Sequence, residues 1–74
     1  MDEGFILSNK FRRVIFAELM SGETDIEQIA KKHNIIRNVA IRIADDFIRE
    51  EIVEKKDNSY FLTNDGEKLA ANIK

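Results

Sequence analysis

Arg37, Asn38 and Arg42 have side chains suited to pairing with nucleic-acid bases, and they lie close together in mid-chain. Arginine can form two hydrogen bonds with guanine and asparagine two with adenine, each pairing discriminating by about 1–3 kcal/mol. On an ideal helix Asn38 and Arg42 share a face that Arg37 and Ile41 flank. Ile41 could also contact a thymine methyl group. Arg37, Asn38, Ile41 and Arg42 are therefore candidate base contacts. A solvent-facing stripe, with Ile41 packed against a neighbouring element, is the alternative.

The same stretch is basic although the chain is acidic. Residues 28–44 contain no Asp or Glu and four Lys and Arg, whereas the whole chain has 12 Lys+Arg, 14 Asp+Glu and a net charge of -2. A basic segment of this kind is a candidate contact for a polyanion. A solvated helix face whose acids are displaced by chance would give the same pattern. Five side chains near predicted turns are candidate phosphate contacts, with ordinary exposure as the alternative: Lys31, Lys32, His33, Lys55 and Lys56.

Composition argues against catalysis. The chain has no Cys, one His and three Gly, which leaves neither a nucleophile with its base, nor a thiolate metal site, nor a glycine-rich phosphate loop. We therefore expect no enzyme activity, cofactor, metal or small-molecule ligand. No apolar run approaches the roughly 20 residues of a membrane span, and no signal peptide is evident. With 74 residues we expect one cytoplasmic domain, 1–74.

Apolar spacing predicts the elements that position these side chains. A first helix over 9–20, capped by Ser8, carries an apolar stripe and ends at Ser21-Gly22. Phe16 and Met20 widen the stripe enough for a second subunit or for packing against the C-terminal segment. A capping box from Thr24 to Glu27 starts a short second helix, whose inner face is Ile26, Ile29 and Ala30.

A tight turn and a long helix follow. Asn34 tolerates the left-handed backbone that such a turn needs, and Ile35 should point inward. The third helix is predicted over 36–50. Its inner face should consist of Ile36, Ala40, Ile43, Ala44 and Phe47. Beyond it, the sequence favours a hairpin with strands over 52–56 and 60–62 and a turn over 57–59. It also predicts a last amphipathic helix over 64–73.

This order resembles a winged helix-turn-helix domain of the MarR/ArsR-like type found in small bacterial and archaeal transcription regulators. The resemblance covers about residues 9–73 and rests on two segments, Asp25–Ile35 and Ile52–Leu69. The second contains Leu62-Thr63, Gly66 and Leu69, similar to the family's pattern where the wing enters the last helix. At two positions where the family commonly has glycine, this chain has Asn34 and Glu51.

The resemblance implies a mainly α fold with a small β-hairpin: a three-helix core, a two-stranded wing over about 52–62 and a C-terminal helix over about 64–73. The helix-turn-helix would span about 25–50, with the recognition helix 36–50 in the DNA major groove. It implies a sequence-specific regulator that binds double-stranded DNA as a homodimer through its first and last helices. The alternative is a winged-helix module for protein–protein interaction without DNA binding, which the acidic balance and Asp45 and Asp46 favour.

Overall fold

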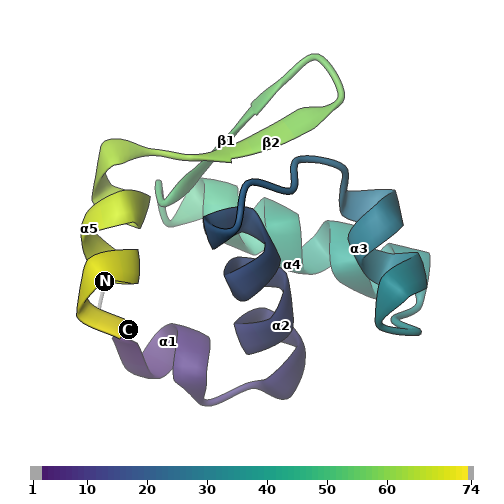
Figure 1. Cartoon of the computed structure of the whole chain (residues 1–74), viewed down its shortest axis with the longest axis horizontal. Coiled ribbons are helices and arrows are strands. Elements are labelled where there is room, and N and C mark those ends of the chain that lie inside the picture. Colours follow the sequence, from purple (N-terminus) through teal and green to yellow (C-terminus); the bar gives the residue numbers. More distant parts are fainter. Residues whose placement is uncertain (1–2, 74) are drawn as a thin grey trace.

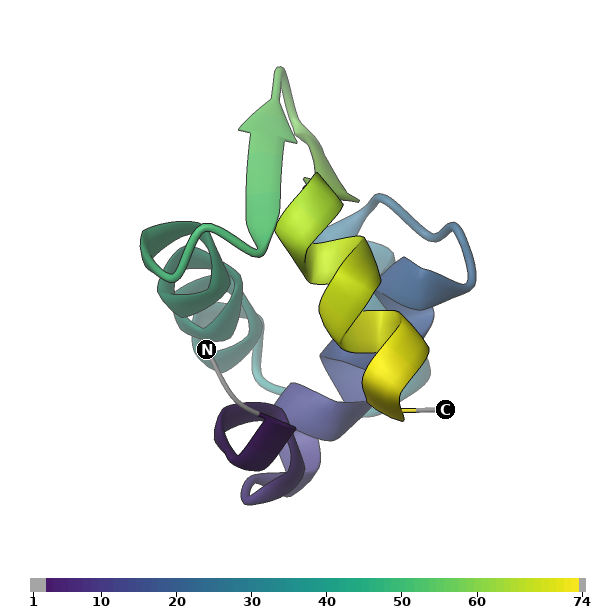
Figure 2. The same cartoon turned by 90° about the vertical axis from the view of Figure 1, so that its left-hand side faces the viewer.

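Helices dominate residues 3–73, the part of the chain that the computed structural model describes. In chain order the elements are α1 (Glu3–Leu7), α2 (Lys10–Met20), α3 (Ile26–Lys32), α4 (Arg37–Arg49), β1 (Val53–Lys56), β2 (Ser59–Leu62) and α5 (Asn64–Ile73). The hairpin projects from the helices, with α3 and α5 on opposite sides (Figures 1 and 2). This confirms the predicted mainly α class with a small hairpin. Residues 1, 2 and 74 of the predicted domain lie outside the described part.

The core lies where α2 and α4 cross. Phe16 of α2 and Phe47 of α4 are almost fully buried and pack edge to face, with ring centroids 5.9 Å apart. Edge-to-face packing brings the positive rim of one ring onto the negative face of the other. Ile15, Ile29 and Ile52 complete this centre from α2, α3 and the residue before β1. The Phe16 side chain is therefore buried within the fold and is not accessible to a second subunit.

The first helix, α1, was not predicted. It spans five residues, too few to be stable alone, so tertiary contacts must hold it. Ile6 is 1% exposed in the core. Arg12 of α2 donates from Nη1 to the Phe5 carbonyl oxygen at 3.2 Å, and Arg13 donates from Nη1 to the Leu7 carbonyl oxygen at 2.7 Å. Both arginines thus fasten α1 to α2.

Two predicted helix caps are wrong by one residue. Asn9, not Ser8, caps α2, because its Oδ1 accepts from the backbone N–H of Phe11 at 2.9 Å. Asp25, not Thr24, caps α3 in the same way, accepting from Glu27 N at 2.9 Å. Ser, Thr, Asn and Asp are all good caps, so adjacent candidates compete and the local pattern does not separate them.

The helices α2, α3 and α4 end in the same way. The residue after each C-cap is left-handed: Gly22 at φ 103°, Asn34 at φ 56° and Glu51 at φ 64°. The next amide then donates back into the last turn, as Ile35 N does to the Ala30 carbonyl oxygen at 2.8 Å. The predictions for Asn34 and for inward-pointing Ile35 are confirmed. At Glu51 the backbone takes the glycine-like conformation without the glycine.

The hairpin is tied to the helices by its second strand. Val53 pairs with Leu62 and Lys56 with Ser59, so the two-residue loop 57–58 is shorter than the predicted turn. The Tyr60 N–H donates to the Thr24 carbonyl oxygen at 2.9 Å, which links β2 to the segment before α3. This bond fixes the hairpin beside the start of α3.

The start of α5 explains the spacing of Thr63 and Gly66. The Thr63 Oγ1 accepts from Gly66 N at 3.0 Å and donates to the Glu51 carbonyl oxygen at 2.7 Å. A Cβ atom at Gly66 would lie 3.0 Å from the Ile52 carbonyl carbon and closer still to its oxygen. Glycine is therefore required for α5 to approach the chain at this point.

Candidate nucleic-acid interface

Three of the four predicted base-contacting residues lie on the exposed side of α4. Arg37, Asn38 and Arg42 are exposed, and Arg42 forms no ion pair with any residue between 3 and 73. Ile41 is half-buried and packs against the core, which is the alternative considered for it. Arg37, Asn38 and Arg42 therefore form the polar surface of the first half of α4.

Ile36 was expected inside and lies outside. It is 72% exposed, because α4 begins one residue later than predicted. Ile36 is the N-cap, with φ -59° and ψ 131°, so its side chain does not follow the helical spacing that would turn it inward. The rest of the predicted inner face, Ala40, Ile43, Ala44 and Phe47, is buried as expected.

The end of α3 and its C-cap carry Lys31, Lys32 and His33 in different settings. Lys31 is exposed and makes no ion pair within the described chain. Lys32 Nζ lies 3.0 Å from Glu18 Oε2, and His33 Nε2 lies 2.6 Å from the same oxygen. Hydrogen bonds from His33 and Lys32 lower the pKa of Glu18, a group on α2 whose side chain is only 14% exposed. Glu18 thus holds Lys32 and His33 against α2.

A cleft of about 420 Å³ separates the hairpin from the starts of α3 and α4. Arg37 and Ile41 of α4 line it together with Lys55 of the hairpin, so two predicted contacts from distant segments lie at one cleft. Its other lining residues are Asp25, Ile26, Glu27, Asn58 and Tyr60. Lys55 Nζ also lies over the Tyr60 ring, 5.6 Å from its centroid. Lys56 is exposed at the hairpin tip.

Acids from outside the basic stretch compensate part of its charge. Arg37 Nε lies 3.2 Å from Glu27 Oε1, with both side chains more than half exposed. Glu18 pairs with Lys32 as described above. Two of the four cations in the acid-free stretch therefore have carboxylate partners, and Lys31 and Arg42 have none among residues 3–73. The first half of α4 and the preceding turn remain positive in balance.

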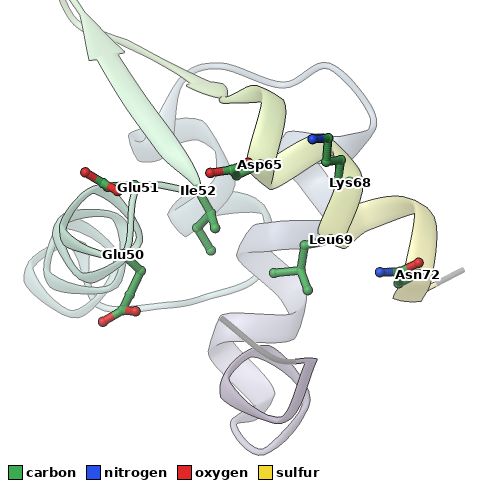
Figure 3. Close-up of a pocket in the computed structure, with 7 residues that line it drawn as sticks. All are labelled: Glu50, Glu51, Ile52, Asp65, Lys68, Leu69 and Asn72. Carbon is green, nitrogen blue, oxygen red and sulfur yellow. The ribbon is translucent and has the colours of Figure 1, made fainter.

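The opposite end of α4 is acidic. Figure 3 shows a second cleft between the end of α4 and α5, about 430 Å³ in volume, with Glu50, Glu51 and Asp65 around it. Lys68 is the one cation that lines it, and the Ile52 and Leu69 side chains point into it. The acidic side chains around this cleft would repel an anion.

Two further features bear on function within residues 3–73. No helix is long and apolar enough to cross a membrane. No group of three or more His, Cys, Asp or Glu side chains is arranged to hold a metal ion. Compared with protein-family models, curated proteins and solved structures, the chain shows no significant match.

Proposed function

We propose that this protein is a winged helix-turn-helix domain that binds double-stranded DNA and regulates transcription, in the manner of MarR/ArsR-like regulators. The element order supports the fold: α3 and α4 joined by a tight turn, then a hairpin, then α5. The bond from Tyr60 N to the Thr24 carbonyl oxygen supports it too, because it keeps the hairpin beside the helix pair. In this fold the second helix of the pair enters the major groove.

The cleft between α4 and the hairpin carries the proposal. Lys55 and Arg37 both line it, although the two residues lie in different elements. A duplex engaged by the start of α4 would therefore also meet the hairpin. The α4 N-terminus has no side-chain cap, so its first amides are available to a phosphate and the helix dipole favours that contact.

Each cation has a role that its setting suggests. Arg42 and Asn38 project from the exposed face of α4 and would contact bases. Lys31 of α3 and Lys56 at the hairpin tip, both exposed, would contact phosphates and set the register without selecting sequence. Arg37 must leave Glu27 before it can join them. Lys32 and His33, held by Glu18, would contribute less.

Dimerisation would supply the affinity that one small domain lacks. A two-fold dimer on two half-sites doubles the contacts. The proposed contact uses the first and last predicted helices, which are α2 and α5. Phe11 on α2 is 41% exposed and Leu7 on the neighbouring α1 is 43% exposed, so both side chains are open to such a contact. The proposed location of such a regulator is the cytoplasm.

A protein–protein interaction module is the second candidate. The two ion pairs that neutralise Lys32 and Arg37 favour it, because they reduce the positive potential of the face that would meet DNA. The net charge of -2 acts in the same direction. On this hypothesis the protein does not retain duplex DNA at any salt concentration.

Retention of a mixed duplex pool at low and high salt separates the two candidates. Each phosphate contact releases counterions, so with about four contacts the affinity should fall by roughly 100-fold between 50 and 200 mM salt. Arg42→Gln should weaken binding to the preferred sequences by about 5- to 100-fold if the arginine contacts a base. Lys68→Gln, the same charge loss at the acidic cleft, should leave retention nearly unchanged. No retention at low salt favours the interaction module.

A further inference from the structure

Ile36 is the most exposed of the large apolar side chains in the described chain. It is 72% exposed, whereas Leu7, Phe11 and Phe61 are 41–43% exposed. Isolated apolar residues on a surface are common and need no explanation by themselves. The position of Ile36, directly before the first turn of α4, is what distinguishes it.

The chain departs from its own pattern at this position. It caps α2 with Asn9 and α3 with Asp25, both of which accept backbone N–H bonds. The N-cap of the longest helix is instead Ile36, which makes no side-chain cap bond. An isoleucine here forgoes the cap and exposes apolar surface. Local rules broken without a compensating contact in the fold are characteristic of functional positions.

The neighbours of Ile36 indicate what would cover it. Arg37 follows directly, and Lys31, Lys32 and the C-cap residue His33 lie at the end of α3. An apolar protein surface would have to bury these charges beside Ile36, at a cost. A DNA major groove has phosphates at its rims for the cations, and on its floor the thymine C5-methyl is the apolar group.

We propose that Ile36 contacts the C5-methyl group of a thymine and so selects an A·T pair where α4 enters the major groove. This inference rests on the proposed DNA binding and adds a specificity to it. It replaces Ile41, which packs against the core, as the residue that recognises thymine. Asn38, two residues further on, could pair with adenine at the same end of the site.

Alternating poly(dA-dT) and poly(dA-dU) duplexes test the contact. They have the same charge and length, and every second base on each strand carries the methyl group in one and lacks it in the other. Burial of one methyl group predicts that the protein binds the thymine duplex about three- to fivefold more tightly. Competition at low salt measures this ratio directly.

Matched variants separate the contact from differences between the two duplexes themselves. Ile36→Ser should lose the thymine preference while the fold gains a cap, seen as an unchanged or higher melting temperature. Phe61→Ser, which alters a half-exposed apolar residue on β2, should keep the preference. Equal binding of both duplexes, or a preference that survives in Ile36→Ser, would refute the role of Ile36 while leaving DNA binding intact. No binding to either duplex would overturn the proposed function itself.

Discussion

Glu27→Gln should strengthen DNA binding, because Glu27 competes with DNA for Arg37. The two side chains are 58% and 61% exposed and their charged atoms lie 3.2 Å apart. An exposed pair of this kind contributes about 0–1 kcal/mol. A carboxylate roughly 10 Å from a phosphate adds up to about 0.4 kcal/mol of repulsion before screening. Removing both effects predicts a gain of up to about 1.4 kcal/mol, or up to about tenfold in Kd.

Glu50→Gln is the matched control for that measurement. It makes the same charge change at the other end of α4, roughly 20 Å from Arg37, about twice the Debye length at 0.1 M salt. Fluorescence anisotropy with a labelled mixed duplex at 0.1 M salt would compare both variants with the parent protein. Binding that is equal in Glu27→Gln and Glu50→Gln, or weaker in Glu27→Gln, would show that Arg37 takes no part in the contact.

Three further predictions concern stability, each measured by urea unfolding. Gly66→Ala should lower the free energy of unfolding by about 2 kcal/mol or more, because a backbone carbonyl occupies the space that the new Cβ would need. The control Ala71→Gly, at an exposed site of the same helix, should lower it by about 1 kcal/mol, because alanine favours a helix over glycine. Glu51→Gly should stabilise by up to about 1 kcal/mol by relieving the left-handed backbone, and Glu50→Gly, at φ -84°, should destabilise. Because the pKa of Glu18 is lowered from 4.5 by its two donors, its stabilising contribution is complete above pH 4.5 and is lost as the pH falls through the folded-state pKa. The stability difference between the parent and Glu18→Gln should therefore disappear in acid.

Local interactions made much of the fold predictable. Ala40, Ile43 and Phe47 recur at helical spacing, so their burial follows from the geometry of one helix. Asn34 identifies the turn because few residues adopt a left-handed backbone at low cost. Gly66 belongs with them, since a glycine near a helix start indicates a close approach even before the partner carbonyl is known.

Features that depend on distant contacts were missed. The helix α1 forms because Ile6 packs into the core. The sequence of a five-residue segment does not indicate such a distant contact. Thr24 has a side chain suited to an N-cap, but Asp25 is the cap. The Thr24 carbonyl oxygen instead accepts from the backbone N–H of Tyr60, which is far away in sequence. Ile36 matches the apolar spacing of the helix, which predicts a buried side chain. The helix begins one residue later than predicted, so the Ile36 side chain is exposed. Helix ends are where local rules decide least.

The charge of the candidate site also depends on contacts between residues that are distant in sequence. The acid-free stretch contains four Lys and Arg residues, but in the folded protein Glu18 pairs with Lys32 and Glu27 with Arg37. The two acids differ in kind. Glu18 is 14% exposed and receives two donors, so its bond to Lys32 belongs to the fold, while Arg37 can exchange the exposed Glu27 for a phosphate at little cost. On the proposed function, Lys31 and Arg42 make the first contacts, Arg37 follows by exchange, and Lys32 stays with α2.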